Sequence, residues 1–202
     1  MISAKEALKR LQVGNERFAS GSGNLHSLDH EARRSELANG QTPFAIILGC
    51  SDSRVPAEIV FDQGVGELFV IRVAGNIVAP SQVGSIEFAA QQFGTRLVVV
   101  LGHSTCGAVE ATLEELEQPS KDRSPNLRSI VDRIRPSVET LLETNASLGS
   151  EELLHHAVRA NVRASVSSLQ HGSKILEELV EKEELMIVGA EYSLETGIVD
   201  FF

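Results

Sequence analysis

Four short apolar runs, separated by stretches with helical patterning, constrain the fold of this chain more than any other feature. Each run is rich in Val, Ile and Leu and has the length of a strand that is buried on both faces, as in a parallel sheet. Strands that alternate with helices indicate an α/β fold with right-handed connections. The runs are residues 44–48, 68–73, 97–101 and 185–188.

Helices are expected between these runs. Ser81 is a preferred N-cap residue and predicts a helix that runs to Phe93 and ends at Gly94. A terminal run at residues 198–202 is expected to add an edge strand. We therefore predict an α/β fold, with a mainly parallel four- to five-stranded sheet flanked by helices. The other predicted helices are 105–117, 125–142, a long helix that ends near Gly172, and 173–184.

The first 40 residues predict a helical arm. Ala4, Leu8, Leu11 and Phe18 stand at helical spacing and form a narrow apolar stripe. A glycine-rich hinge follows, and a second short helix is expected at residues 29–37. We expect residues 1–40 to form the N-terminal arm and residues 41–202 to form the α/β domain. The pattern allows the arm to dock on another subunit or to pack on its own domain.

The charge balance excludes one class of partner. The chain has 18 Lys and Arg against 28 Asp and Glu, a net charge of −10, so it lacks the basic surplus that nucleic acid requires. Its N-terminal segment has no apolar export core, and no run reaches the roughly 18 apolar residues of a membrane span. We expect a cytoplasmic protein without a membrane partner, whose two cysteines, Cys50 and Cys106, are reduced.

Chemically reactive side chains follow two of the apolar runs directly. Cys50, Asp52 and Arg54 follow the first run, and in an extended segment these alternate residues share one face. His103 and Cys106 follow the third run. Sites in open α/β sheets form beyond the carboxyl ends of strands, so the two loops converge if their strands are neighbours.

Two thiolates and an imidazole form a common zinc ligand set, with a fourth position that water or Asp52 can take. A single His-x-x-Cys motif with one distant Cys is a weak signal, and buried thiols beside a hydrogen-bonded histidine are the alternative. The position of both halves at strand ends favours the metal site. The other histidines have no second ligand motif and are expected to be solvated or to cap helices.

Taken together, the motifs resemble those of the bacterial β-class carbonic anhydrases. The resemblance rests on Cys-Ser-Asp-Ser-Arg at residues 50–54, on His-x-x-Cys-Gly at 103–107, and on the segment 66–76 between them. It implies a zinc enzyme that reversibly hydrates carbon dioxide to bicarbonate and a proton, by attack of zinc-bound hydroxide. It also implies a homodimer or homotetramer and favours an arm that docks on a neighbouring subunit.

The resemblance assigns roles to the reactive side chains. It implies one Zn²⁺ per chain, held by Cys50, His103 and Cys106. Asp52 would be a fourth ligand only in a closed form of the site. In the open form, Asp52 and Arg54 would act as a catalytic dyad that orients the reacting water.

Further roles come from the resemblance alone. The backbone N–H of Gly107 would lie near the substrate oxygens. Arg72 and Tyr192 match two members of a regulatory bicarbonate site that some family members have. Ile47 stands where those members have tryptophan, and the chain has no Trp, which argues against bicarbonate regulation.

Two other functions compete with carbon dioxide hydration. The same zinc ligands would serve a hydrolase that acts on carbon disulfide or carbonyl sulfide, and an assay on each gas separates the two. A non-enzymatic zinc-binding or sensing protein would have its site permanently closed by Asp52. The presence of Arg54 beside Asp52 argues against that alternative, because the guanidinium competes for the carboxylate.

Overall fold

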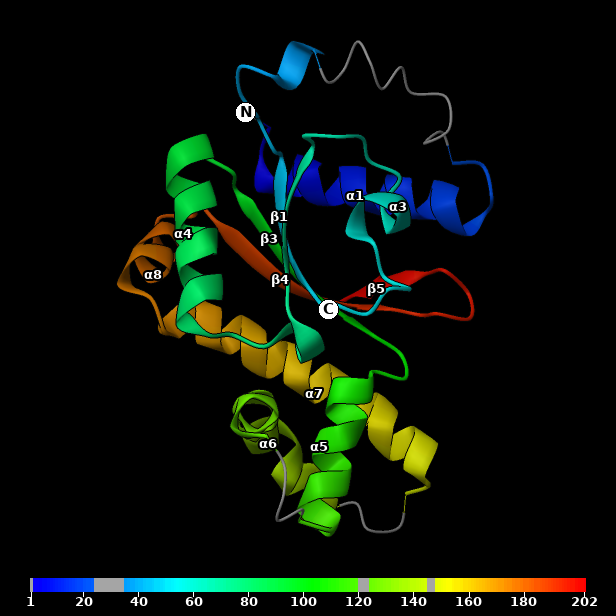
Figure 1. Ribbon diagram of the computed structural model, residues 1–202. Helices are drawn as coiled ribbons and strands as arrows, with labels where there is room; N and C mark the ends of the chain where they lie inside the picture. The colour runs from blue at the N-terminus through cyan, green and yellow to red at the C-terminus, as the bar shows by residue number, and fades with distance from the viewer. Residues whose placement is uncertain (1, 24–34, 120–123, 145–147) are drawn as a thin grey trace.

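The computed structural model describes residues 2–23, 35–119, 124–144 and 148–202 (Figure 1). Its centre is a five-stranded sheet with the order β2-β1-β3-β4-β5. Neighbouring strands are parallel except for β5, which runs antiparallel to β4. The predicted α/β fold with a mainly parallel sheet is confirmed. The strands are β1 (Ala45–Gly49), β2 (Leu68–Arg72), β3 (Leu97–His103), β4 (Met186–Tyr192) and β5 (Val199–Phe201).

Helices flank the sheet and extend beyond its carboxyl end, where Figure 1 shows α5 and α6. None of the helices among the described residues is both long enough and apolar enough to cross a membrane. The predicted short helix at residues 29–37 falls largely outside the described residues. The helical elements are α1 (Ala4–Ala19), α3 (Ala57–Val60), η2 (Ala74–Asn76), α4 (Pro80–Phe93), α5 (Gly107–Glu117), α6 (Pro125–Thr144), α7 (Ser150–His171) and α8 (Lys174–Glu181).

The central strands β1 and β3 are buried on both faces. Leu48 and Val100 belong to the apolar cluster on the side of α4, α7 and α8. Ile47 and Val99 point the other way and pack in the cluster on the side of α1 and α3. All four side chains are completely buried, and each such burial contributes about 1.5–3 kcal/mol. This two-sided packing fixes the positions at which the carboxyl ends of both strands emerge.

A third apolar cluster lies beyond the carboxyl ends of β1 and β3. Val109 of α5, Ile134 of α6 and Val158 of α7 are buried there together with Cys50 and Cys106. The two cysteines therefore lie between the end of the sheet and a layer of three helices. This position shields their sulfur atoms from solvent.

Helix α1 packs on the sheet of its own chain. Leu11 is fully buried in the cluster that also contains side chains of β1 and β3. Asn15 is 4% exposed and donates to the carbonyl oxygens of Val60 and Gly197, at 3.1 and 2.8 Å. Its side-chain oxygen accepts a hydrogen bond from the backbone N–H of Val199. Helix α1 of the predicted arm therefore packs on its own chain, and docking of the arm on another subunit stays a prediction.

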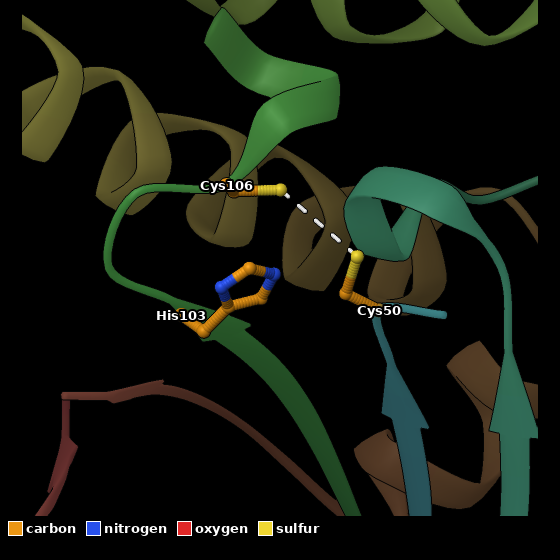
Figure 2. Close-up of side chains that lie close together, drawn as sticks. All are labelled: Cys50, His103 and Cys106. Carbon is orange, nitrogen blue, oxygen red and sulfur yellow. Dashed lines mark hydrogen bonds between the residues drawn. The ribbon is translucent and has the colours of Figure 1, made fainter. Parts of the chain in front are cut away.

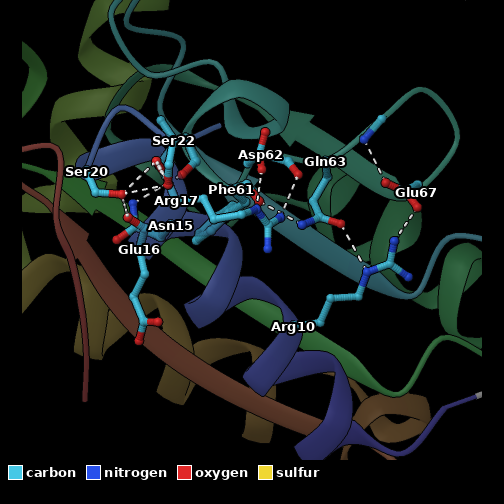
Figure 3. A network of polar contacts seen from close by, with 12 residues as sticks. Arg10, Asn15, Glu16, Arg17, Ser20, Ser22, Phe61, Asp62, Gln63 and Glu67 are labelled. Atoms are coloured by element: carbon cyan, nitrogen blue, oxygen red, sulfur yellow. Dashed lines mark hydrogen bonds and ion pairs between the residues drawn. The ribbon is translucent and has the colours of Figure 1, made fainter. Parts of the chain in front are cut away.

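Ion pairs at the surface of α1 strengthen this contact (Figure 3). Arg10 pairs with Glu67, and Arg17 pairs with Asp62, whose side chain is almost fully buried. Arg10 also donates to the side-chain oxygen of Gln63 at 3.1 Å. All three partners lie between α3 and β2, so the helix is attached to the segment that follows the Cys50 loop.

The start of α4 differs from the prediction. Ala79 is the N-cap residue and Pro80 is the first helical residue, whereas the predicted cap, Ser81, lies inside the first turn and donates to Gln82. Proline is common at the first helical position, because its φ suits a helix. The N–H that proline lacks would have no acceptor there in any case. The end was predicted correctly, since Gly94 terminates the helix with a φ of 62°.

The elements around the third run also differ from the prediction. Strand β3 continues two residues past the apolar run and includes His103, which pairs in register with Tyr192 of β4. Helix α5 begins at Gly107, two residues later than expected. The intervening Thr105 has a φ of 51°, which is outside the helical region. The strand is therefore longer than predicted, and a tight turn takes the place of the first two residues of the predicted helix.

Two glycines provide a test of this packing. A Cβ on Gly102 of β3 would lie 2.6 Å from Val162 Cγ2, so we expect Gly102→Ala to lower the free energy of unfolding by about 1–3 kcal/mol. Gly84 in α4 has nothing within 4 Å of its Cβ position, and Gly84→Ala should raise it by about 0.5–1 kcal/mol. Urea denaturation measures the free energy of unfolding of both variants. A Gly102→Ala variant with an unchanged free energy of unfolding would contradict the close contact between β3 and α7.

Candidate metal centre

Three potential metal ligands converge at the carboxyl ends of β1 and β3. These strands are neighbours, with Gly49 in register with Leu101, so the loops that follow them meet. One ligand atom from each of Cys50, His103 and Cys106 lies within 4.8 Å of the others. Figure 2 shows the three side chains pointing toward a common centre. The convergence predicted from the two motifs is therefore confirmed.

The spacing of the two sulfur atoms fits a shared metal ion. The Sγ atoms of Cys50 and Cys106 are 4.0 Å apart, and both cysteines are free and buried. A disulfide requires about 2.05 Å. Two thiolates bound tetrahedrally to zinc at about 2.3 Å have their sulfur atoms about 3.8 Å apart. The observed separation is close to that value.

His103 has one ring nitrogen available for a metal. Its Nδ1 lies 2.9 Å from the carbonyl oxygen of Ser104, which accepts the N–H and leaves the lone pair of the neutral ring on Nε2. The side chain is fully buried, and Nε2 has no hydrogen-bond partner among the described residues. An unsatisfied buried polar atom costs about 1–3 kcal/mol, and binding a metal removes this cost. The three residues therefore fit a zinc ion.

An unusual backbone conformation brings Cys106 close to His103. Thr105 between them has a φ of 51°, which is strained for a β-branched residue. Hydrogen bonds on both sides of Ser104 stabilise the turn: its N–H donates to Tyr192 O and its hydroxyl accepts from Leu194 N. This turn could not be predicted from the sequence, because neither glycine nor asparagine occupies the left-handed position.

The pKa values of the two thiols shift in opposite directions. The hydrogen bond with Cys106 lowers the pKa of Cys50, although burial opposes the shift. The pKa of Cys106 is raised, first by its hydrogen bond with Cys50 and then by burial. In the metal-free site, these shifts favour Cys50 over Cys106 as the first of the two thiols to lose its proton. A metal ion would displace the second proton.

A backbone N–H also contacts Cys50. The N–H of Gly75 in η2 donates to Cys50 Sγ at 3.3 Å. Gly75 has a φ of 69°, and a Cβ there would lie 2.7 Å from Ile134 Cδ1. The sequence showed only a glycine in the Gly-Asn pair after β2, which is consistent with a close backbone approach but does not identify the sulfur as its target.

Asp52 and Arg54 form a bidentate ion pair at the mouth of the site. Arg54 donates from Nε to one carboxylate oxygen of Asp52 at 2.9 Å and from a terminal nitrogen to the other at 2.7 Å. These hydrogen bonds hold the pKa of Asp52 well below its usual range. The nearer Asp52 oxygen is 3.8 Å from His103 Nε2, and Asp52 is not part of the group of three converging ligands.

The comparisons with known proteins agree with this geometry. The family model described as carbonic anhydrase matches residues 45–199, which include all three converging ligands. A solved β-carbonic anhydrase, CcaA, superposes with a TM-score of 0.78 at 27% identity, covering 98% of this chain and 88% of that one. The chain belongs to the β-carbonic anhydrase family.

Relatives extend the match over nearly the whole chain. Carbonic anhydrase 2 of Mycobacterium tuberculosis is 40% identical over 193 residues, which cover 95% of this chain and 89% of the relative. The carbonic anhydrase of Mycolicibacterium smegmatis is also 40% identical, with 96% and 91% coverage. A structure described as one of two tetrameric β-carbonic anhydrases from Sordaria macrospora has a TM-score of 0.74 at 25% identity, with 86% and 88% coverage.

The two residues assigned to a regulatory bicarbonate site lie on different strands. Arg72 ends β2 and Tyr192 ends β4, with β1 and β3 between them. Arg72 donates from Nε to the carbonyl oxygen of Cys50 at 2.9 Å and from a terminal nitrogen to that of Asp52. The assignment of Arg72 and Tyr192 to a regulatory site stays a prediction from the family resemblance, and Ile47 in place of tryptophan argues against regulation by bicarbonate. Bicarbonate would compete with these two carbonyl groups for the Arg72 guanidinium.

Gly107 begins helix α5 directly after Cys106. Among the described residues, none approaches within 4 Å of the position that a Cβ on Gly107 would take, apart from its chain neighbours and its own helix backbone. The first N–H groups of a helix have no intrahelical acceptors and favour electronegative partners. A cavity of about 770 Å³ lies beside Arg54, Ser104 and Thr105, on the outer side of the ion pair that Arg54 makes with Asp52.

The unequal thiols lead to a testable prediction for the metal-free protein. Ultraviolet absorbance of thiolates should show about one thiolate per chain near neutral pH, because the pKa of Cys50 is lowered and that of Cys106 is raised. Cys106→Ala removes the hydrogen-bond donor that stabilises the Cys50 thiolate, so this absorbance should appear at higher pH. Metal-free wild-type protein without any thiolate near pH 7 would contradict the predicted sharing.

Proposed function

We propose that this chain hydrates carbon dioxide reversibly to bicarbonate and a proton, using one zinc ion per chain. The observation that carries the proposal is the buried Nε2 of His103, which has no hydrogen-bond partner in the described part of the chain and lies close to the sulfur atoms of Cys50 and Cys106. A metal ion is the group that satisfies this nitrogen and two thiolates together. Membership of the carbonic anhydrase family supports the choice of metal and reaction.

Cys50, His103 and Cys106 would hold the zinc ion and leave a fourth position open. A zinc ion with an open coordination position lowers the pKa of the water that binds there, and so makes a hydroxide nucleophile available near neutral pH. The surrounding residues would exclude bulk water, since both cysteines and the histidine are buried. Burial strengthens the electrostatic interactions within the site.

Asp52 and Arg54 would act as an orienting dyad. Both carboxylate oxygens of Asp52 are bound by the Arg54 guanidinium, which favours a position away from the metal ligands. An ionised Asp52 in this position can accept a hydrogen bond from the reacting water and fix its orientation. The lowered pKa of Asp52 supports this role, because it keeps the carboxylate ionised throughout the neutral range.

The backbone N–H of Gly107 would bind an oxygen of the substrate. Two features support this assignment: the open space beside its α-carbon and its position at the first turn of α5. A backbone donor there would stabilise the negative charge that develops on carbon dioxide as bicarbonate forms. A side chain at position 107 would occupy the same space.

We also propose that residues 41–202 form the zinc-binding domain, that residues 1–40 form the arm, and that the chain assembles as a homodimer or homotetramer. The tetrameric relatives from Sordaria macrospora support the assembly. The edge of the sheet gives a further reason. Phe88 is 53% exposed and packs against Phe69 of β2, so an apolar surface lies beside the outer edge of this sheet, where β2 has no further neighbour among the described residues.

Stopped-flow measurement of carbon dioxide hydration, with zinc determined on the same sample, tests the function. We expect activity that rises between about pH 7 and about pH 8.5, because two thiolates neutralise the charge of zinc and leave its water less acidic than at a three-histidine site. A flat profile from about pH 6 to about pH 9 would contradict this explanation. Stoichiometric zinc without activity would favour the sulfur-gas hydrolase or the closed binding protein.

Arg54→Ala tests the dyad. Without the guanidinium, Asp52 is free to bind zinc, so hydration should fall at least about 100-fold while the zinc content is retained. Arg17→Ala is the matched control, because it also removes an ion pair with an aspartate but lies on α1. It should lower stability and leave the activity of the folded protein unchanged. Full activity of Arg54→Ala would rule out the proposed role.

A further inference from the structure

Helix α7 presents two buried side-chain donors to the turn that follows β2. Asn161 donates from Nδ2 to the carbonyl oxygen of Gly75 at 2.8 Å. Ser165 donates from its hydroxyl to the carbonyl oxygen of Asn76 at 3.2 Å. The two donors are four residues apart and therefore lie on the same face of the helix. Asn161 and Ser165 are 2% and 5% exposed.

These donors hold a turn with an uncommon backbone. Gly75 and Asn76 are consecutive and have φ values of 69° and 43°, both in the left-handed region. The turn is buried, so its carbonyl groups need partners within the protein. Asn161 and Ser165 supply them from one side. Ile134 and Ala108 pack against Gly75 on another side, as close as 2.7 Å to its Cβ position.

The orientation of this turn determines what Cys50 contacts. The peptide that contains the Gly75 N–H donates to Cys50 Sγ at 3.3 Å, while the Gly75 carbonyl is bound by Asn161. A hydrogen bond to a thiolate withdraws electron density from sulfur and weakens its donation to a metal. Asn161 is therefore connected to the sulfur through a single residue.

We propose that Asn161 is a positioning residue of the metal centre, which fixes the Gly75 N–H on Cys50 and so sets the donor strength of that thiolate. This inference rests on the proposed zinc function. Asn161 bonds to the Gly75 backbone and acts on the sulfur through it. Ser165 supports the same turn through the longer of the two hydrogen bonds.

A purely structural role for Asn161 is the competing explanation, and Asn15 provides the matched control. Asn15 is also a buried asparagine, 4% exposed, whose amide donates to a backbone carbonyl at 2.8 Å. Its partners, Val60 and Gly197, lie on the side of α1. Replacing either asparagine removes a buried amide of the same kind, but only Asn161 is connected to a metal ligand.

The experiment compares Asn161→Leu with Asn15→Leu, which preserve approximate side-chain volume. Each protein is loaded with cobalt(II), and the sulfur-to-cobalt charge-transfer band is recorded. Zinc affinity is measured by competition with a chelator, and stability by urea denaturation. We expect Asn161→Leu to shift the band to longer wavelength, because a sulfur that loses the Gly75 hydrogen bond donates more strongly to the metal. We also expect zinc binding to weaken about tenfold, because the released turn no longer orients the Cys50 side chain. Asn15→Leu should lower stability without either effect.

The outcomes separate this inference from the proposed function. Wild-type protein without a thiolate band would refute the metal centre itself. A normal wild-type band with an unchanged band and zinc affinity in Asn161→Leu would overturn the positioning role alone. If Asn161→Leu does not fold, Ser165→Ala replaces it, because it removes only the longer hydrogen bond. A smaller shift in the same direction would support the inference, and no shift would overturn it.

Discussion

The pairing of β1 with β3 is the interaction on which the rest of this structure depends. It places Gly49 in register with Leu101, so the loops that follow the two strands begin side by side. Neither segment has a complete ligand set: the loop after β1 carries Cys50, whereas His103 ends β3 and Cys106 follows it. The apolar side chains that hold the two strands together therefore also assemble the metal centre, although none of them is a ligand.

Two arginines stabilise the Cys50 loop, one through its backbone and the other through a side chain. Arg72 reaches from the end of β2 and binds the backbone carbonyl groups of Cys50 and Asp52. Arg54 belongs to the loop itself and binds the Asp52 carboxylate. One guanidinium thus fixes the path of the chain while the other fixes a side chain. This division leaves the orientation of Asp52 dependent on one exposed residue, and the loop backbone dependent on another.

Much of this fold and site was predictable from the sequence because the signals are local. Apolar runs of strand length indicated the parallel sheet, and the residues directly after them indicated Cys50 and His103 as ligands. The left-handed turn at Thr105 was not predictable, since the residue type disfavours it. The contacts of Gly75 and Asn161 were also missed, because they join segments 86 residues apart and depend on how α7 packs.

Helix α7 also packs closely against the sheet. Its Val162 fills the space that two glycines leave: a Cβ would lie 2.6 Å from it at Gly102 and 2.9 Å from it at Gly189. The residue before Val162 is Asn161, which holds the turn against the Cys50 sulfur. Undocking of α7 would therefore open the sheet core and release the turn at the same time. Loss of the proposed zinc ion and partial unfolding should therefore be one event, so zinc retention during storage or heating would report on the docking of a single helix.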